Sequence, residues 1–319
     1  MHRNSTLDVR IKSIKQETAT IKRFTLQALN ESKLPPFSGG SHITTYLPEK
    51  SGTLERSYSV FNLSEPGLIE VAVRLAEPST GGSEYWHHHV SEGDVLKVSY
   101  PKNHFPLSFQ AKHHVFYAAG IGITPFLSMM AELAEKNQSF ELHYAAKSKE
   151  QCAFYDYLNE TYLGQCHFYF SKGEKPERLT VTTLKNHRIG THVYFCGPEK
   201  MIQEFTSAAK SYGYPAFNVH YERFSPPVMK DSIPFAVTLN QSGKHLDVPA
   251  DQSLLDVLRE SGIYIPYSCR VGGCGTCEVN VVEGKIDHYD SFLTDKQRSS
   301  NKAMLSCVSR GKGNLVLDL

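Results

Sequence analysis

Four of the seven cysteines lie in the last 51 residues, at a spacing that could hold a metal cluster. Four residues separate Cys269 from Cys274, two separate Cys274 from Cys277, and Cys307 follows after 29 more. This is the ligand spacing of a plant-type two-iron, two-sulfur (2Fe-2S) cluster, in which four thiolates provide two ligands for each iron. Glycines suit such a loop, because backbone that curls around a cluster adopts unusual dihedral angles, and three stand here: Gly272, Gly273 and Gly275.

A structural zinc site is the alternative for these four cysteines. Zinc sites usually place their cysteines as two C-x2-C pairs, which this spacing does not repeat. The spacing therefore favours the cluster over zinc. Cys152 and Cys166 stand apart from the pattern, and we expect them to be small buried hydrophobic residues.

A second motif is a glycine turn between an apolar segment, 114–119, and a predicted helix, 123–136. Gly120 and Gly122 would let a dinucleotide approach the backbone at the positive end of that helix. The third glycine of the usual fingerprint is absent, and the Pro125 that follows Thr124 is also a good helix starter for purely structural reasons. A later strand ends in Cys196, Gly197 and Pro198, at the edge where open sheets bind ligands, which strengthens the nucleotide interpretation.

Two polar motifs lie nearer the N-terminus. Arg56, Ser57, Tyr58 and Ser59 combine a cation for a phosphate, a ring that can stack and hydroxyls that can hydrogen-bond a ring nitrogen. A second group, Gly81, Gly82 and Ser83, begins a predicted helix, where backbone N–H groups suit a further phosphate contact. Each motif alone could also belong to any polar strand or turn.

The elements that must position these residues fall into three groups. Up to about residue 100 the chain alternates apolar and polar residues, which predicts a small antiparallel β-barrel with strands at 7–14, 20–26, 42–47, 58–62, 68–74 and 95–100. From about residue 112 the pattern of strand, turn and helix predicts a doubly wound parallel sheet. After Ser225, Pro226 and Pro227 a new domain begins, with a hairpin turning at Ser242 and Gly243, a helix over 254–260 and a last strand over 314–319.

Composition sets limits on the function. The chain has 319 residues, enough for two or three domains, with 40% hydrophobic and 21% charged residues. The chain has 34 Lys and Arg against 33 Asp and Glu, so its net charge is close to zero and does not favour nucleic-acid binding. The most apolar stretch, 115–130, is interrupted and too short to span a bilayer, and no signal-peptide core follows Met1. We expect a cytoplasmic protein with neither a nucleic-acid nor a membrane partner.

Barrel, nucleotide-binding sheet and plant-type ferredoxin in this order resemble the phthalate dioxygenase reductase family. The likeness covers essentially the whole chain and includes Glu222, Arg223 and Phe224 and the ending 315–319. The resemblance implies an FMN-binding barrel at 1–108, an NAD-binding α/β domain at 109–225, a linker at 226–233 and an α+β, β-grasp ferredoxin domain at 234–319. Ala119 departs from the pattern, since the family usually has glycine there.

The resemblance also implies an activity. Members of the family take a hydride from NADH onto FMN and pass single electrons through the 2Fe-2S cluster to a separate terminal oxygenase, commonly of the Rieske type. A flavin suits the middle position because it accepts two electrons together and releases them singly. A stand-alone NAD(P)H-dependent flavin or ferric reductase and a redox-sensing binding module remain as alternatives.

Roles for individual residues follow only from the resemblance. Arg56, Gly81, Gly82 and Ser83 would bind the FMN phosphate, with Ser57 beside them, Tyr58 at the isoalloxazine ring and Ser59 at the N5 edge. Gly120, Gly122 and Thr124 would line the nicotinamide dinucleotide, Cys196 and Gly197 would lie near the nicotinamide, and Phe224 would cover the flavin. Ser59, Thr124, Cys196 and Glu222 are the predicted catalytic residues, and the four cysteines are the metal ligands.

Two further segments leave questions open. Lys147, Ser148 and Lys149 follow the second strand of the nucleotide domain, where an acid favours NAD and a cation accommodates a 2′-phosphate. The resemblance favours NADH, while this local charge leaves NADPH open. Arg270 and Val271, on the rim of the cysteine loop, are the predicted docking residues for the oxygenase.

Overall fold

The computed structural model describes residues 6–29, 36–49, 52–62, 67–227 and 232–319. The chain divides into two compact units, residues 1–222 and 223–319, which are described separately. Part of the predicted linker, residues 228–231, lies outside the described residues. Within these described ranges, no helix is both long and apolar enough to cross a membrane.

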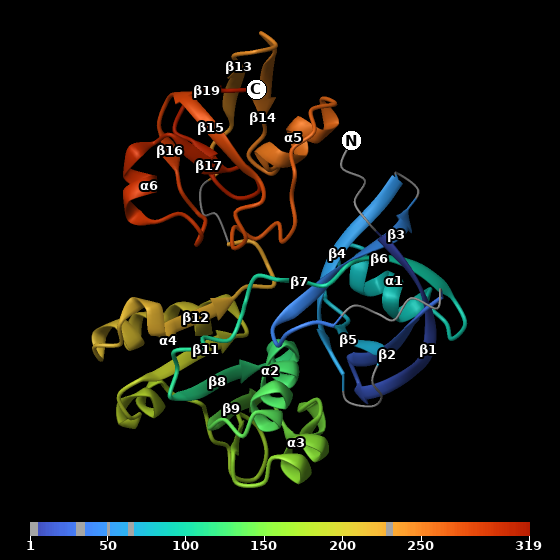
Figure 1. The fold of residues 1–319 in the computed structure, drawn as a ribbon. Coiled ribbons are helices and arrows are strands. Elements are labelled where there is room, and N and C mark those ends of the chain that lie inside the picture. The colour runs from blue at the N-terminus through green and yellow to red at the C-terminus, as the bar shows by residue number, and fades with distance from the viewer. Residues whose placement is uncertain (1–5, 30–35, 50–51, 63–66, 228–231) are drawn as a thin grey trace. The chain divides into compact units, whose positions relative to one another are not determined.

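The first unit begins with the predicted antiparallel barrel (Figure 1). Its sheet has the order β4-β5-β2-β1-β6-β3-β7, and pairing of β4 with β3 closes it. Valine, isoleucine and phenylalanine side chains fill the interior because alternate residues of each strand point inward. The strands are β1 (Thr6–Thr18), β2 (Ile21–Ala28), β3 (Ser41–Glu49), β4 (Gly52–Phe61), β5 (Leu68–Arg74), β6 (Val95–Ser99) and β7 (Lys102–Asn103), with helix α1 (Gly82–His88) between β5 and β6.

Strand β4 begins earlier than the sequence predicts. The expected strand covers 58–62, whereas β4 covers Gly52–Phe61. Its polar first half forms a continuous antiparallel ladder with β3, in which Arg56 lies opposite Thr45 and Ser57 opposite Thr44. This pairing is long-range, so a local pattern of polar residues does not reveal it.

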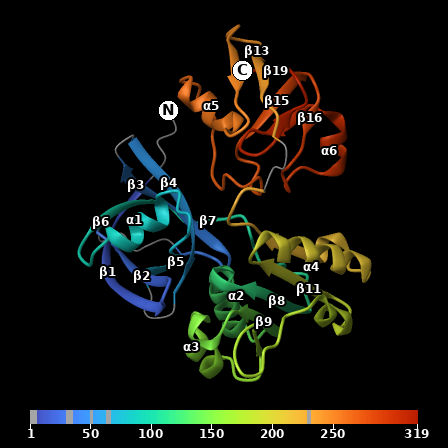
Figure 2. The ribbon, with the colours of Figure 1, turned by 180° about the vertical axis from the view of Figure 1, so that it is seen from behind.

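The second half of the unit is the predicted parallel sheet, with the order β10-β9-β8-β11-β12. Helices α2 and α3 pack on one face (Figure 1), and α4 packs on the other (Figure 2). The strand order reverses between β8 and β11, which is where open α/β sheets bind ligands at the carboxyl edge. The elements are β8 (His113–Ala119), α2 (Thr124–Glu135), β9 (Phe140–Ala146), α3 (Tyr155–Thr161), β10 (Cys166–Phe170), β11 (Thr191–Cys196), α4 (Glu199–Ser211) and β12 (Val219–Glu222).

Direct contacts join the barrel to this sheet within the first unit. The backbone N–H of Gly39 donates to Oε2 of Glu132 on α2 at 2.7 Å, and the N–H of Gly40 donates to the Ser128 hydroxyl at 3.2 Å. Phe61 at the end of β4 meets Phe154 edge to face, with 5.4 Å between ring centroids. These contacts hold the end of the flavin-motif strand against the nucleotide domain.

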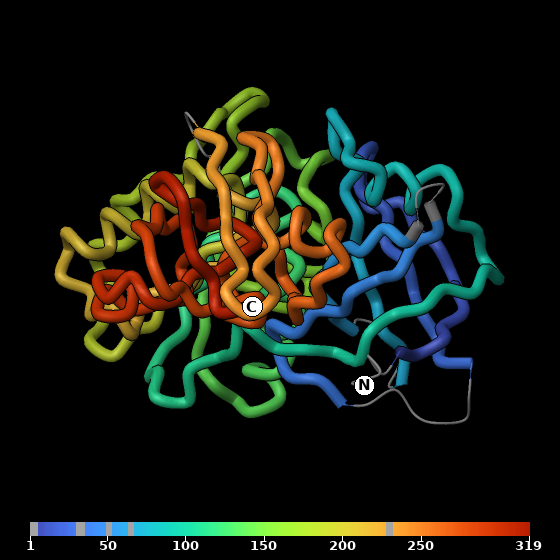
Figure 3. The backbone as a smooth tube through the Cα atoms, turned by 90° about the horizontal axis from the view of Figure 1, so that it is seen from above, coloured from blue at the N-terminus to red at the C-terminus, as the bar shows by residue number. Residues whose placement is uncertain are grey.

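The second unit has a five-stranded sheet of order β14-β13-β19-β15-β17, in which only β13 and β19 run parallel. The hairpin of β13 and β14 turns at Ser242 and Gly243, as predicted. Figure 3 shows the backbone of this unit in orange and red. Its elements are β13 (Phe235–Leu239), β14 (His245–Val248), α5 (Leu254–Glu260), β15 (Glu278–Glu283), β16 (Ile286–Asp287), α6 (Asp295–Ser300), β17 (Ala303–Leu305), β18 (Arg310–Gly311) and β19 (Leu315–Leu317).

Helix α6 is absent from the sequence prediction, although a local signal for it exists. Thr294 accepts a hydrogen bond from the backbone N–H of Gln297, whose side chain in turn bonds to the backbone of Thr294. This reciprocal arrangement is a capping box, which a Thr followed three residues later by Gln predicts.

Candidate functional site

Arg56 lies beside the start of α1, where the sequence predicts a phosphate site. Its guanidinium donates to the Thr80 carbonyl at 2.7 Å and to the Thr80 hydroxyl at 3.1 Å. A Cβ on Gly82 would come within 2.5 Å of the Arg56 side chain, so only glycine permits this approach. Gly81 has a φ of 91°, a conformation that favours glycine, and it leads directly into the helix. The structure thus brings the two predicted phosphate motifs together.

Ser83 and Ser79 organise the same turn. The Ser83 hydroxyl accepts from the backbone N–H of Ala76 at 3.1 Å and lies 3.2 Å from the Ser79 hydroxyl. Ser79 in turn accepts from the N–H of Gly81 at 3.1 Å. These bonds fix the turn from which the N–H groups of α1 emerge.

Tyr58 and Ser59 point to opposite faces of β4, because successive residues of a strand alternate. Tyr58 packs towards the barrel interior, with its ring 5.7 Å from that of Trp86, and burial raises the pKa of its hydroxyl. Ser59 is buried on the face that carries Phe61, towards α2 and the nucleotide domain. Ser57 shares that face but is exposed.

The glycine turn and the later Cys-Gly-Pro turn are in direct contact. A Cβ on Gly122 would lie 2.2 Å from the carbonyl oxygen of Cys196 and 2.8 Å from the nitrogen of Gly197. A Cβ on Gly197 would lie 3.1 Å from the Ala119 Cβ. The two turns therefore form one surface at the carboxyl ends of β8 and β11, which run parallel with Cys196 opposite Ala118.

Thr124 and a residue outside the sequence prediction, Tyr144, hold the glycine turn in place. The Thr124 side chain is buried and donates to the Ile121 carbonyl at 3.0 Å. The Tyr144 hydroxyl, from neighbouring β9, donates to the Gly120 carbonyl at 3.0 Å. A buried tyrosine needs a partner for its hydroxyl, and this requirement is the sequence signal that could have pointed to Tyr144.

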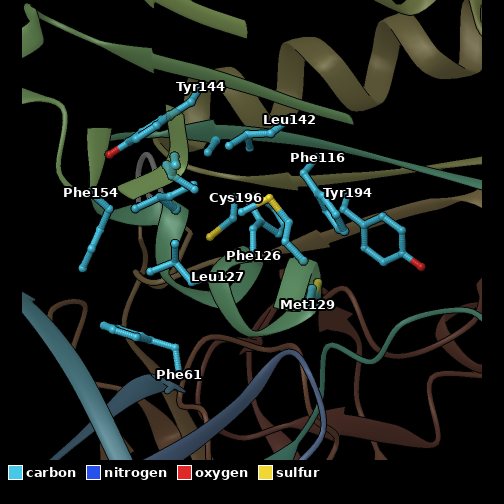
Figure 4. Packing of buried hydrophobic residues seen from close by; sticks show 14 of the residues in the cluster. Phe61, Phe116, Phe126, Leu127, Met129, Leu142, Tyr144, Phe154, Tyr194 and Cys196 are labelled. Atoms are coloured by element: carbon cyan, nitrogen blue, oxygen red, sulfur yellow. The ribbon is translucent and has the colours of Figure 1, made fainter. Parts of the chain in front are cut away.

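Cys196 and Glu222 end adjacent strands and lie opposite one another in the parallel pair of β11 and β12. Cys196 is fully buried among the residues shown in Figure 4, and burial, with the charge of Glu222, raises the pKa of its thiol. Burial raises the pKa of the Glu222 carboxyl to about 8. Its Oε2 atom is buried and has no hydrogen-bond partner among the described residues, so this end of the sheet holds an unsatisfied polar group.

The four predicted ligand cysteines form two interacting pairs. Cys269 interacts with Cys274, and Cys277 with Cys307, while weaker interactions link Cys274 to Cys277 and Cys269 to Cys307. Hydrogen bonding from Cys269 lowers the pKa of the Cys274 thiol to about 4, and hydrogen bonding from Cys307 lowers that of Cys277. Two thiol pairs are the donor set that a two-iron cluster requires. Within the described part of the chain, no three His, Cys, Asp or Glu side chains converge on a single cation position.

The backbone of the cysteine loop fits the same group. The N–H of Val271 points at the Cys269 sulfur, 3.5 Å away, as in loops that stabilise cluster sulfurs. Gly272 and Gly275 both have a φ of 76°, and a Cβ on Gly275 would collide with the Phe292 ring at 2.3 Å. Arg270 also has a positive φ and forms an ion pair with Asp256, so it is half-buried and engaged within the domain.

Phe224 is the one residue predicted for the flavin and nucleotide sites that lies in the second compact unit, which begins at Arg223 and also holds the four ligand cysteines. The residue is 44% exposed.

Comparisons with known proteins agree with this organisation. Residues 237–312 match the family described as the 2Fe-2S iron-sulfur cluster binding domain. Residues 99–219 match the N-terminal domain of the family described as dimethylamine monooxygenase subunit DmmA-like.

Full-length relatives cover nearly the whole chain. The heme-dependent oxidative N-demethylase beta subunit of Ectopseudomonas mendocina (strain ymp) is 40% identical over 318 residues, 98% of this chain and 99% of that protein. The carnitine monooxygenase reductase subunit of Escherichia coli (strain K12) is 39% identical over 98% of each chain. The solved structure of phthalate dioxygenase reductase aligns with a TM-score of 0.78 and 33% identity, over 99% of this chain and 98% of that one.

A barrel that carries the flavin motif, a nucleotide-binding sheet and a ferredoxin-type domain together define an electron-transfer oxidoreductase. The chain belongs to the phthalate dioxygenase reductase family, whose relatives include the reductase subunits of oxygenase systems. The family resemblance and the fold class predicted from the sequence are thereby confirmed.

Proposed function

We propose that this chain is the reductase component of a two-component oxygenase, which moves electrons from NADH through FMN and a 2Fe-2S cluster to a terminal oxygenase. The observation that carries the proposal is the pairing of Cys269 with Cys274 and of Cys277 with Cys307 in a domain of the 2Fe-2S family. A chain with a flavin motif and a nucleotide site but no cluster would support only a simpler flavin reductase. The boundaries 1–108, 109–225, 226–233 and 234–319 are part of this proposal.

The FMN would be held at the turn before α1. Arg56 would donate charge-assisted hydrogen bonds to its phosphate, together with the N–H groups at Gly81, Gly82 and Ser83. Ser59 would donate its hydroxyl to the N5 edge, because it lies on the β4 face that is turned towards the nucleotide domain. Ser57 would border the ring from the same face of β4 as Ser59. Tyr58, whose ring packs towards Trp86 in the barrel interior, is proposed at the edge of the flavin ring from the family resemblance alone. Bound flavin supplies the conversion between two-electron and one-electron transfer.

The nicotinamide dinucleotide would lie across the surface formed by the glycine turn and the Cys196-Gly197 turn. Gly120 and Gly122 would expose backbone N–H groups to the pyrophosphate, and Thr124 would hold the helix start that faces it. Cys196 would exclude water beside the nicotinamide, since its neutral thiol is fully buried. The Glu222 carboxyl would hold a proton beside Cys196 at neutral pH. Phe224 would shield the flavin ring from solvent.

The partner is proposed to be a terminal oxygenase, and we keep the Rieske type as the expectation for it. Relatives of similar identity include a heme-dependent oxidative N-demethylase subunit and a carnitine monooxygenase reductase. A heme-dependent oxygenase is therefore the competing partner, and electron delivery to it can be compared with delivery to a Rieske-type oxygenase. Docking at Arg270 and Val271 stays a prediction. Because Arg270 is paired with Asp256, charge reversal there must be checked for an intact cluster spectrum. We propose a cytoplasmic location.

Visible spectroscopy of the purified, air-protected protein tests the proposal. Before NADH the spectrum should contain both flavin and iron–sulfur bands, and stoichiometric NADH should bleach both. Flavin bands alone, or zinc in elemental analysis, would overturn the cluster and leave a stand-alone flavin or ferric reductase. A cluster that NADH never reduces would instead support a redox-sensing module.

The Arg56→Ala variant should lose FMN. Removing a charge-assisted hydrogen bond costs about 1.5 to 3 kcal/mol, which raises the Kd for FMN roughly tenfold to hundredfold. Fluorescence titration of the flavin-free protein measures this Kd. Arg10→Ala is the matched control, because Arg10 is an exposed arginine of the same barrel. Equal Kd values in wild type and Arg56→Ala would contradict the phosphate role.

The raised pKa of Glu222 predicts a pH-dependent stability. Its carboxyl ionises near pH 4.5 when unfolded but near 8 when folded, so the folded state holds the proton and loses stability as pH rises between these values. Glu222→Gln should therefore gain in unfolding temperature over wild type as pH rises from about 5 to about 9. Release of FMN fluorescence on heating measures the temperature. Glu204→Gln, at an exposed position on α4, should follow wild type. Parallel curves for Glu222→Gln and wild type would rule out the buried proton.

A further inference from the structure

A buried carboxylate beside the cysteine loop has no role in the electron transfer proposed above. We propose that Asp290 lowers the reduction potential of the cluster held by the four cysteines, so that this cluster passes its electron to the partner more readily. The carboxylate acts through its charge and is not one of the four ligands, so Asp290 is a positioning residue. The inference rests on the proposed function, because it takes Cys269, Cys274, Cys277 and Cys307 as the ligands of a 2Fe-2S cluster.

The Asp290 side chain is fully buried, in the segment between β16 and α6. Its Oδ2 atom accepts hydrogen bonds from the backbone N–H groups of Phe292 at 3.2 Å and Leu293 at 2.8 Å. Its Oδ1 atom accepts from the Ser309 hydroxyl at 3.4 Å. Three donors to one carboxylate replace part of the water that burial removes, so the fold accommodates a negative charge at this position.

The same segment lies directly against the cysteine loop. The N–H of Ser291 donates to the Gly272 carbonyl at 2.9 Å. A Cβ on Gly272 would lie 3.0 Å from the Asp290 Cα, which is closer than most Cβ contacts. The Gly272 backbone also hydrogen-bonds the Cys307 thiol, and Ser309, which bonds to the carboxylate, follows Cys307 by two residues. Gly272 and Ser309 therefore each connect Asp290 to a predicted cluster ligand.

Two basic side chains face the carboxylate. Arg298 of α6 places Nη2 3.5 Å from Oδ2 of Asp290 and donates to the Asp290 backbone carbonyl at 2.7 Å. His288 places Nδ1 3.4 Å from Oδ1. The Arg298 side chain is 33% exposed and that of Asp290 is 0% exposed, so solvent screens the guanidinium charge more than the carboxylate charge. Arg298 thus neutralises Asp290 only in part, and a negative field remains at the cysteine loop.

The sign of the effect follows from the charge that reduction adds. A 2Fe-2S cluster gains one negative charge when it accepts an electron, and nearby charge and hydrogen bonds to its sulfurs set its potential. A buried carboxylate repels the added charge and disfavours the reduced form. Asp290 therefore lowers the potential, and Arg298 opposes this effect.

Two variants of this ion pair test the charge effect in the flavin- and cluster-loaded protein. Asp290→Asn keeps an oxygen that can accept from the N–H groups of Phe292 and Leu293 but removes the charge, so the potential should rise. Arg298→Gln leaves the carboxylate uncompensated, so the potential should fall. We expect the ratio of reduced to oxidised cluster at a fixed applied potential to change by about tenfold in each direction, about 59 mV for a one-electron couple. Spectroelectrochemical titration measures the potential, and iron analysis confirms that the cluster is present.

Two further variants serve as controls. Arg298→Lys keeps the positive charge and should stay closer to the wild-type potential than Arg298→Gln. Asp247→Asn removes an exposed carboxylate from β14, at the opposite edge of the sheet from β17, and should leave the potential unchanged.

A purely structural role for Asp290 would shift the potentials of Asp290→Asn and Arg298→Gln in the same direction or leave both unchanged, and either result would overturn the inference. If Asp290→Asn holds no iron, Arg298→Gln decides alone, since it retains the carboxylate. A lowered potential in that variant then supports the inference and an unchanged one overturns it. Absence of iron–sulfur bands from the wild type would instead overturn the proposed function.

Discussion

The Cys274→Ser variant should still reduce FMN with NADH but should fail to reduce one-electron protein acceptors such as cytochrome c. Cys274 is paired with Cys269, so its loss leaves one iron with a single thiolate. Mutation of a residue that merely hydrogen-bonds to a metal ligand lowers metal affinity or activity roughly tenfold to hundredfold. Loss of a ligand itself should therefore lower electron transfer to the acceptor at least about hundredfold. Iron analysis, the visible spectrum and the two rates of electron transfer measure the result.

Cys166→Ser is the matched control for this variant. Cys166 begins β10, is half-buried and lies outside the four-cysteine pattern, so its replacement should keep the iron content and both rates. Two results for Cys274→Ser would contradict the assignment. Iron–sulfur bands that persist would show that Cys274 is not a ligand, and loss of flavin reduction by NADH would show that the two functions are not separable.

The cysteine loop could be predicted from the sequence because its information is local. Cys269, Cys274 and Cys277 lie within nine residues, and the glycines that permit the curled backbone lie between them. The pairing of Cys277 with Cys307 depends on the antiparallel ladder of β15 and β17. In this ladder Glu278, the residue after Cys277, lies opposite Leu305, two residues before Cys307. Spacing identifies the four ligands, but only this strand pairing decides which two belong together.

Features that depend on strand register could not be read from the sequence. Glu222 lies next to Cys196 because β11 and β12 are in parallel register, with 25 residues between the two positions. No local pattern marks a carboxylate that will be buried beside a thiol. The same holds for Arg56, whose approach to Gly82 arises from the path of the chain between β5 and α1.

The docking prediction for Arg270 does not account for a long-range contact that this residue forms. Arg270 lies in the cysteine loop, directly after Cys269, and an arginine in a loop is usually exposed at the surface. The structure pairs it with Asp256 on α5, which precedes it by 14 residues. Arg270 therefore contributes to the stability of the loop, and a docking role for its charge has to be tested with that in mind.

The Gly122→Ala variant should strongly weaken nucleotide binding. The added Cβ would lie 2.2 Å from the Cys196 carbonyl oxygen and 2.5 Å from the carbonyl carbon, both backbone atoms at the end of a buried strand. Neither can move without shifting β11, so the glycine turn and the Cys196-Gly197 turn must separate. Overpacking of this kind costs about 1 to 3 kcal/mol. We expect the rate of flavin reduction at limiting NADH to fall by roughly tenfold to hundredfold.

Gly197→Ala gives the graded comparison for this effect. There the nearest atom to the new Cβ is the terminal methyl of Met201 at 3.0 Å, which is the flexible end of a side chain and can rotate away. The loss should therefore be smaller than for Gly122→Ala, although both glycines border the same surface. Stopped-flow reduction of the flavin measures both variants, and the FMN content shows that the barrel is intact. Equal losses would mean that removal of glycine from either turn, rather than collision with Cys196, limits binding. Only the Cβ on Gly122 comes closer than 3.0 Å to backbone atoms, whereas the nearest backbone atom to a Cβ on Gly197 is the Ala119 nitrogen at 3.3 Å.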